Sequence, residues 1–231
     1  MSYFGDIRIG RMPLGDVEIT KAFLGDDLVF QKGGTPPEPP TPSRLPAGYT
    51  EVEYIENTTT AFINTGIIYP CTWTITAQAN AVPATNQILV GSKTSAGHYV
   101  GAITNGYWGT TTNASYYIAG YPNTARTQLT ITINRKSVEF SAEDSATKTH
   151  NATSNIDTAI WLFAASKTAS STYPFIGKVY GDVVGVKEGV EVFRGVPCTD
   201  PNGVAGLYDL VSEAFFGSAN TATFAAGPAI N

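Results

Sequence analysis

Short segments with the pattern of β-strands recur about every ten residues over most of this chain. The clearest is 129–133, in which Leu and two Ile alternate with two threonines, as in a strand with one buried face. A second alternating segment, 138–140, follows after 134–136, and the two together predict a hairpin. No segment combines sustained helical periodicity with helix caps. We therefore expect an all-β fold, a two-sheet antiparallel β-sandwich of the jelly-roll kind.

Nine segments carry the strand pattern strongly enough to be predicted. They are 49–56, 73–77, 88–91, 116–119, 129–134, 137–142, 160–165, 177–186 and 191–196. The composition agrees, because 23 Gly and 14 Pro suit turns, while 12 Tyr and 11 Phe suit half-buried pleated surfaces. Charged residues make up 14% of the chain and the net charge is −5, which argues against nucleic-acid binding through phosphate contacts.

Neither a membrane-spanning segment nor a secretory signal is expected. The chain has no apolar run of about 18 residues, and its start lacks a basic region followed by an apolar one. We therefore expect synthesis in a cytoplasm without membrane insertion. Cys71 and Cys198 are then expected as free thiols, although a single disulfide is possible by number alone. They lie too far apart in the sequence to resemble a metal-binding pair.

The first 32 residues contain a short repeat with a period of ten. Gly-Asp pairs stand at 5–6, 15–16 and 25–26, with apolar residues at matching positions around them. This pattern predicts three short strands joined by Gly-Asp turns. So short a segment buries too little apolar surface to fold alone, so it needs its own copies, the following domain or another protein. The candidate attachment residues are Ile7, Ile9, Leu14, Val17, Ile19, Leu24, Val29 and Phe30.

A proline-rich linker, 33–46, follows this segment and contains six of the 14 prolines. Such spacers adopt the polyproline II form and can separate two bodies by up to roughly 40 Å. A ligand for an SH3-like domain is an alternative interpretation of the same residues. The predicted organisation is an attachment segment at 1–32, the linker at 33–46 and a β-sandwich domain at 47–231.

The two ends of the large domain carry motifs with a family resemblance. They are LPAGYTEVEYIE at 45–56, AFINTGI at 61–67, WLFA at 161–164, IGKVY at 176–180, FRGVPC at 193–198, NGVAGLYD at 202–209, FF at 215–216 and TFAAGP at 223–228. Together they resemble the concanavalin A-like (laminin G-type) lectin/glucanase domain of bacteriophage tail and fibre proteins. The resemblance spans nearly all of 45–228, with its specific motifs outside 79–125. The start of the chain is similar to short N-terminal segments of phage structural proteins.

This resemblance implies a sandwich of two curved sheets that binds carbohydrate or another surface, without implying catalysis. We therefore expect a virion-surface protein, a short fibre or capsid decoration, that displays a lectin-like domain for host-surface glycan adhesion. Residues 1–32 would bind other virion proteins, and by family analogy the chain would form a homo-oligomer, with a trimer favoured. A purely structural decoration protein and a tail or baseplate receptor-binding protein are alternatives. No cofactor is expected.

Aromatic residues crowd the part of the chain that resembles the family least. Six of them, Tyr99, Tyr107, Trp108, Tyr116, Tyr117 and Tyr121, lie between residues 99 and 121. Aromatic faces stack on sugar rings, and a tyrosine hydroxyl can orient them. Tyr107, Trp108 and Tyr121 adjoin Gly or Pro and are the candidate ligand-binding residues, with the polar stretches 105–106 and 110–113 expected as loops. The alternative interpretation places such aromatics in the core.

No catalytic residue is assigned. Glu51, Glu53 and Glu56 imitate the spaced carboxylates of laminarinase-type glycoside hydrolases, in which two carboxyls must lie close together. This segment opens the domain, however, so we expect an edge strand with a solvated acidic face and no enzyme. His98 and His150 lie in no nucleophile motif and are expected at the surface or in loops, without a metal.

The closing motif of the domain has a structural interpretation. Asn202-Gly203 is a tight-turn dipeptide, Cys198 is expected as a small buried hydrophobe, and Phe215-Phe216 are expected to close the core. Oxygen ligands in 143–144 and 200–203 leave a calcium ion conceivable. Turn chemistry alone explains the Asp-Pro-Asn-Gly sequence at 200–203, so no metal site is assigned.

Overall fold

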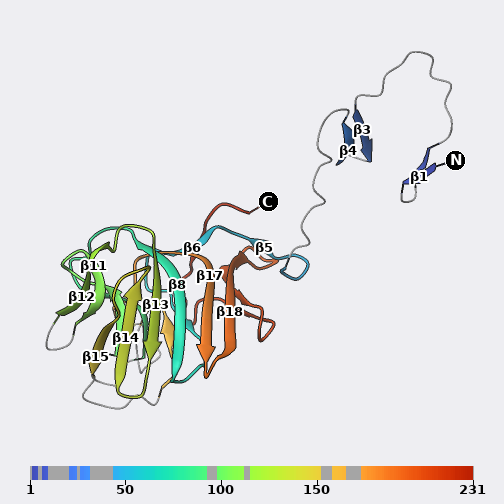
Figure 1. The fold of residues 1–231 in the computed structure, drawn as a ribbon. Helices are drawn as coiled ribbons and strands as arrows, with labels where there is room; N and C mark the ends of the chain where they lie inside the picture. Colours follow the sequence, from blue (N-terminus) through green and yellow to red (C-terminus); the bar gives the residue numbers. More distant parts are fainter. Residues whose placement is uncertain are drawn as a thin grey trace. The chain divides into compact units, whose positions relative to one another are not determined.

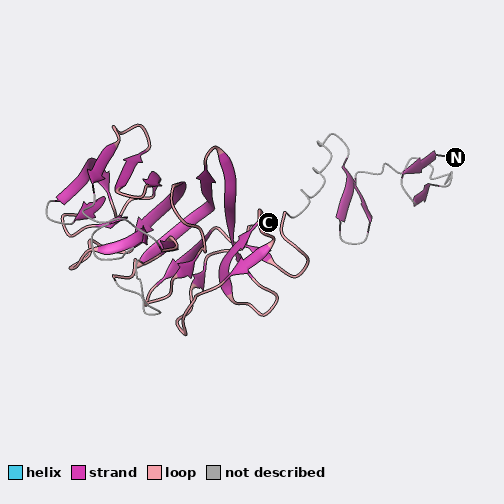
Figure 2. Cartoon of the chain, turned by 90° about the horizontal axis from the view of Figure 1, so that it is seen from below, coloured by secondary structure: helices cyan, strands magenta, loops and turns pink. Residues whose placement is uncertain are grey.

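The fold is all-β in every part of the chain that the computed structural model describes (Figure 1). The structure describes residues 2–4, 7–9, 21–24, 27–31, 44–92, 98–111, 115–151, 158–164 and 173–230. The chain divides into two compact units, Met1–Arg44 and Leu45–Asn231, and the division falls inside the proline-rich segment. Figure 2 shows strands and loops, and no helix, among the described residues.

The first unit contains two antiparallel strand pairs. β1 (Ser2–Phe4) pairs with β2 (Ile7–Ile9), and β3 (Lys21–Leu24) pairs with β4 (Asp27–Gln31). Each pair flanks one of the Gly-Asp dipeptides. The strands expected after the first and third dipeptides correspond to β2 and β4, and the strand expected after the second falls outside the described residues. Of the candidate attachment residues, Ile7 and Ile9 lie in β2, Leu24 in β3, and Val29 and Phe30 in β4, whereas Leu14, Val17 and Ile19 fall outside the described residues.

The second unit is built from two antiparallel sheets. The six-stranded sheet has the order β12-β11-β10-β9-β16-β7, and the larger sheet has eleven strands with the main order β15-β14-β13-β8-β17-β18-β19-β20. The smaller sheet consists of β7 (Ile63–Asn64), β9 (Gln87–Ser92), β10 (His98–Ala102), β11 (Tyr107–Thr111), β12 (Ser115–Pro122) and β16 (Trp161–Leu162). The larger sheet consists of β5 (Thr50–Glu51), β6 (Tyr54–Asn57), β8 (Cys71–Ala79), β13 (Thr127–Ile133), β14 (Ser137–Ala142), β15 (Lys148–Asn151), β17 (Gly177–Lys187), β18 (Val190–Thr199), β19 (Ala205–Asp209), β20 (Ala214–Phe216) and β21 (Ala225–Ala226). The predicted β-sandwich is confirmed.

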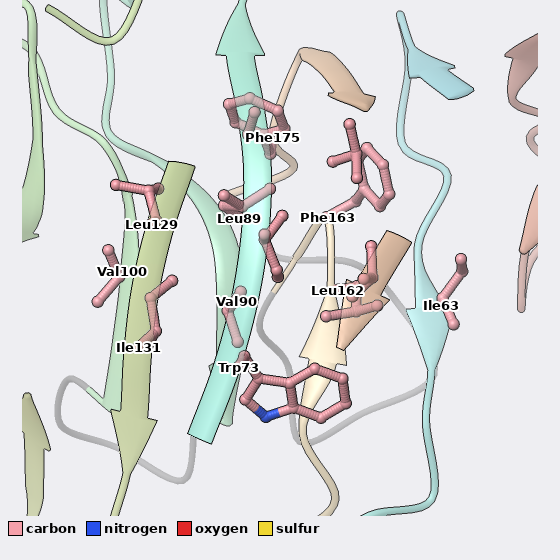
Figure 3. Packing of buried hydrophobic residues seen from close by; sticks show 14 of the residues in the cluster. Ile63, Trp73, Leu89, Val90, Val100, Leu129, Ile131, Leu162, Phe163 and Phe175 are labelled. Atoms are coloured by element: carbon pink, nitrogen blue, oxygen red, sulfur yellow. The ribbon is translucent and has the colours of Figure 1, made fainter. Parts of the chain in front are cut away.

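The core lies between the two sheets, and strands of both contribute buried apolar side chains to it. In β8 every second residue is buried, so Trp73 points inward while the neighbouring threonines point outward. Figure 3 shows Val90 and Val100 of the smaller sheet packed toward Leu129 and Ile131 of the larger one. Burial of these side chains is the main favourable term that holds the sheets together.

The strand predictions succeeded where alternation is strict. Ile133 pairs with Val138, and the Asn134 N–H donates to the Ser137 carbonyl at 2.8 Å, which confirms the expected hairpin.

Two local expectations are wrong. Residues 49–56 were expected to form an edge strand, but β6 in the second half of this segment is flanked by β17 on one side and β21 on the other. Thr110 and Thr111, expected in a loop, lie in β11, and Thr110 is buried.

Candidate binding face on the six-stranded sheet

Three glycines and three tyrosines share the outer face of the six-stranded sheet. Val100, Ala102 and Trp108 belong to the core, so the residues that alternate with them in β10 and β11 point to the opposite face. Gly101 pairs with Gly109, which in turn pairs with Tyr117, and Gly91 pairs with Tyr99. We call this surface the glycine–tyrosine face and define it by its members, Gly91, Tyr99, Gly101, Tyr107, Gly109 and Tyr117.

Tyr107 and Tyr117 form the most prominent contact of this face. Their rings stack with centroids 5.5 Å apart and an interplanar angle of 16°. Tyr117 is 41% exposed and Tyr107 is half-buried. Among the described residues, neither phenol hydroxyl makes a hydrogen bond. The pair therefore presents aromatic surface and two unengaged hydroxyl groups to solvent.

A short hairpin turn holds Tyr107 in place. The Ile103 N–H donates to the Tyr107 carbonyl at 3.1 Å, and the Gly106 N–H donates to the Ile103 carbonyl at 3.0 Å. Gly106 has a φ of +87°, in the left-handed region that favours glycine. Asn123, which is fully buried, donates from Nδ2 to the carbonyls of both Ile103 and Tyr107 at 3.1 Å. The backbone of Tyr107 is thus fixed before any ligand arrives.

Close strand packing explains one glycine of the face. A Cβ atom built on Gly101 would lie 1.8 Å from the Gln87 carbonyl oxygen, so only glycine fits at this position. The register of β10 against β9 also shifts between Val100 and Gly101. Gly101 has no side chain that could cover the backbone between Tyr99 and Tyr117.

A row of cross-strand neighbours continues the face toward the far edge of the sheet. Gly91 also pairs with Trp161, which in turn pairs with the exposed Asn64 of β7. Trp161 is 8% exposed because its ring stacks on Phe62, with centroids 4.3 Å apart and an interplanar angle of 6°. Asn64 accepts a hydrogen bond from the Gly66 N–H through Oδ1. The row therefore ends in an exposed amide side chain.

The three predicted ligand residues separate into different environments. Tyr107 lies on the glycine–tyrosine face, whereas Tyr121 is half-buried and packs against the main core. Trp108 requires a correction, because it is fully buried and packs near Phe175 with ring centroids 5.7 Å apart. Trp108 pairs with Ala102 of the core, whereas Tyr107 stacks on the exposed Tyr117, so the two adjacent aromatics lie on opposite faces of β11. Tyr117, which was not selected from the sequence, is the partner that Tyr107 stacks on.

The predicted acidic segment belongs to the larger sheet and is engaged by its neighbours. Glu53 forms an ion pair with Arg126, whose Nη1 lies 3.2 Å from Oε1, and Glu56 accepts a hydrogen bond from Asn80 at 2.8 Å. Arg126 also lies 4.2 Å above the centre of the Tyr180 ring. These contacts account for the exposed Glu53 carboxylate without a substrate.

The histidines and cysteines are buried. His98 is fully buried and His150 is 6% exposed, so the expected surface or loop positions are wrong for both. Burial lowers the pKa of His150.

Cys71 and Cys198 are free thiols, as expected, and burial raises the pKa of each thiol to about 11. Cys198 packs in a small apolar cluster with Val196 and Tyr208, as expected of a small hydrophobe.

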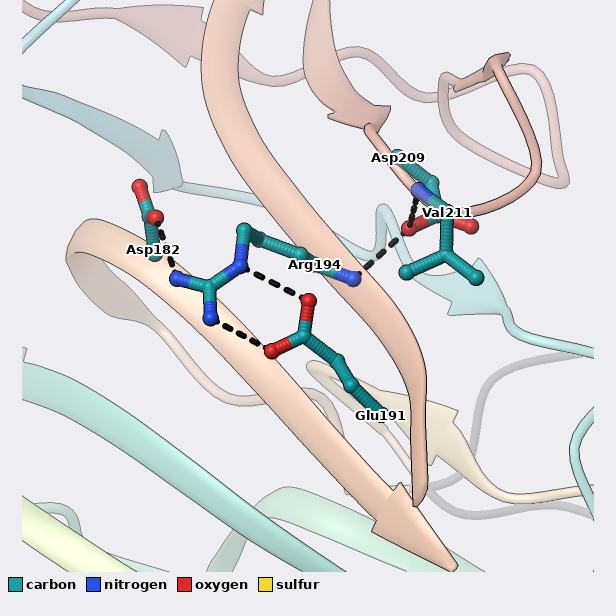
Figure 4. Close-up of polar contacts among 5 residues, drawn as sticks. All are labelled: Asp182, Glu191, Arg194, Asp209 and Val211. Carbon is teal, nitrogen blue, oxygen red and sulfur yellow. Dashed lines mark hydrogen bonds and ion pairs between the residues drawn. The ribbon is translucent and has the colours of Figure 1, made fainter.

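The closing motif is held by its own side chains (Figure 4). Asp209, which is 1% exposed, accepts hydrogen bonds from the backbone N–H groups of Arg194 at 2.7 Å, Val211 at 3.2 Å and Ser212 at 3.1 Å. The Arg194 guanidinium donates to both Glu191 and Asp182. The motif therefore fixes the β18–β19 hairpin to the turn that follows it.

The possible oxygen ligands at 200–203 also serve a turn. Asp200 Oδ1 accepts from the Asn202 N–H at 2.9 Å and from the Val204 N–H at 2.8 Å. These hydrogen bonds to the carboxylate lower the pKa of Asp200, the bond from Val204 most of all. Among the described residues, no group of three or more His, Cys, Asp or Glu side chains is placed to hold a metal ion.

Two comparisons with known proteins were made on the basis of sequence. The sequence matches no protein-family model and no curated protein. Within the described ranges there is also no helix that is long and apolar enough to cross a membrane. A functional proposal therefore depends on the geometry of the sandwich and on the motifs in the sequence.

Proposed function

We propose that this protein is a virion adhesion protein whose β-sandwich binds a host-surface carbohydrate through the glycine–tyrosine face. The observation that carries the proposal is the stacked pair of Tyr107 and Tyr117, which exposes aromatic surface on the outside of a sheet. Sugar rings have apolar faces that pack on aromatic rings, and their hydroxyls bond to phenol groups. The face binds and has no catalytic role in this proposal.

Rigidity of the face favours binding of a weak ligand. The hydrogen bonds from Asn123 fix the turn before Tyr107, and pairing across four strands fixes the backbone at Gly101 and Gly109. A surface that is already ordered loses little conformational entropy when the ligand arrives. A shallow face nevertheless gives modest affinity for a single copy.

The first unit supplies the attachment in this proposal. Residues 1–32 bind other virion proteins or copies of the same chain, as their resemblance to phage structural proteins implies, and a trimer is the favoured assembly. The strand pairs β1–β2 and β3–β4 are too short to be stable alone. Several sandwiches on one particle raise avidity by effective concentration.

The adhesion proposal is tested with the fluorescently labelled full chain and intact bacterial cells, with soluble cell-wall polysaccharide as competitor. Saturable binding that the polysaccharide abolishes, and that Tyr117→Ala weakens, supports the proposal. Tyr54→Ala is the matched control, because it removes a half-buried tyrosine from the larger sheet. A folded chain that binds no cells, even when multimerised, contradicts adhesion and favours a purely structural decoration protein.

The attachment proposal is tested by deletion of residues 1–32. We expect the shortened chain to have a smaller assembly mass in solution and to lose its association with particles. Unchanged mass together with unchanged particle association would contradict the role given to this segment.

A further inference from the structure

The described strands of the six-stranded sheet carry no fixed charge. None of its strands, β7, β9, β10, β11, β12 and β16, contains an Asp, Glu, Lys or Arg residue. Between positions 57 and 125, Lys93 is the one residue of these four types, and it follows β9 directly. The polar groups that the face offers are the hydroxyls of Tyr107 and Tyr117, and the Asn64 amide continues the row.

From this distribution we infer that the ligand of the glycine–tyrosine face is an uncharged glycan. The inference rests on the proposed function and narrows it to one class of carbohydrate. Acidic glycans carry carboxylate, sulfate or phosphate groups, which lose hydration when they contact a protein surface. That loss is offset only where cations or several aligned N–H groups replace the water. The described strands of this sheet supply no such cation.

Two cations near the larger sheet are engaged by neighbouring groups. Arg126 is paired with Glu53 and lies over the Tyr180 ring, and Lys178 lies 4.4 Å from the centre of the Tyr54 ring. A hydrogen bond with Tyr54 is the main cause that raises the pKa of Lys178. Lys178 lies in β17 of the larger sheet, and Arg126 lies in the turn that precedes β13 of that sheet.

The test uses cell-wall polysaccharide from a bacterium to which the full chain binds. Anion-exchange chromatography separates it into an unretained neutral fraction and a retained acidic fraction. Binding of each fraction to the immobilised full chain is measured at low salt and at about 1 M salt, where the Debye length falls to about 3 Å. Tyr117→Ala and Tyr54→Ala are measured in parallel.

We expect the neutral fraction to bind, with an affinity that changes less than about twofold with salt. Tyr117→Ala should lower that affinity about tenfold, and Tyr54→Ala should leave it unchanged. Preferred binding of the acidic fraction, lost at high salt, would overturn the inference while leaving glycan adhesion intact. If neither fraction binds although the chain is folded, the proposed function itself fails.

Discussion

The two sheets of the sandwich have similar inner faces and different outer faces. Inside, both contribute alternating apolar side chains to one core. Outside, several polar side chains of the larger sheet are paired with one another. The Thr72 and Thr132 hydroxyls lie 2.9 Å apart, and Tyr180 donates to Gln78 at 2.8 Å. The smaller sheet instead exposes Tyr117, whose hydroxyl has no partner among the described residues.

This difference separates a surface that supports the fold from one that is available for recognition. Internal hydrogen bonds and ion pairs leave few groups of the larger sheet free to bond elsewhere. On the smaller sheet, the core aromatics stabilise the sandwich more than the exposed Tyr117 does. Substitution of an exposed residue on the glycine–tyrosine face should therefore change binding more than stability, and substitution of a core residue should change stability most.

The largest expected effect is the loss of a buried aromatic side chain from the smaller sheet. Trp108→Ala should reduce the free energy of unfolding by about 3–5 kcal/mol, because it removes a fully buried indole. Tyr117→Ala, on the opposite face of the same sheet, should cost less than about 1 kcal/mol. Urea denaturation followed by tryptophan fluorescence or circular dichroism measures both. Similar reductions in the free energy of unfolding for the two variants would contradict the assignment of inner and outer faces.

The next effect concerns the larger sheet. Asp209→Ala should reduce the free energy of unfolding by about 2–4 kcal/mol, because three backbone N–H groups lose a buried carboxylate partner. Asp200→Ala is the matched control, since this carboxylate serves an exposed turn. Binding by an Asp209→Ala chain that remains folded should equal that of the wild type. Weakened binding by an Asp209→Ala chain that is fully folded in the assay would show that the closing motif contacts the ligand.

Removal of one exposed ring should change binding more than stability. Tyr117→Ala should weaken carbohydrate binding about tenfold, equivalent to about 1.4 kcal/mol, through loss of aromatic contact. Tyr117→Phe should retain most of the affinity if the ring dominates. Isothermal titration of the full chain measures both variants. Equal losses would assign the interaction to the hydroxyl group instead of the ring.

The smallest effect is expected for the exposed ion pair of the larger sheet. Arg126→Ala should change the free energy of unfolding by about 0.5 kcal/mol, because the Arg126 and Glu53 side chains are 54% and 46% exposed. The change should shrink as salt is added, and carbohydrate binding should not respond. A binding defect in this variant would move the candidate site to the larger sheet.

The sequence predicted the architecture well where local alternation is strong. Strict alternation at 129–133 identified β13 and its hairpin partner, because the two faces of these strands meet very different environments. β10 and β11 were missed because Gly101 and Gly109 weaken any strand pattern. Backbone pairing with each other and with β9 and β12 nevertheless places both segments in the sheet.

The candidate site was harder to predict than the fold. Tyr107 and Trp108 are adjacent aromatics, and composition does not indicate which one faces the core. Pairing of Trp108 with Ala102 settles the question, and this register depends on the register shift near Gly101. Asn123 gave no sequence signal beyond the Pro-Asn dipeptide, because its two carbonyl partners lie 16 and 20 residues earlier in the chain.

The most direct test of the central claim is a map of backbone amide chemical shifts. The isotope-labelled full chain is titrated with the neutral cell-wall fraction, and shift changes are assigned by residue. The account predicts changes at Gly101, Gly109 and Tyr117, with little change at Thr74 and Thr130 on the outer side of the larger sheet. Saturable changes that cluster instead around Arg126 and Lys178 would contradict it.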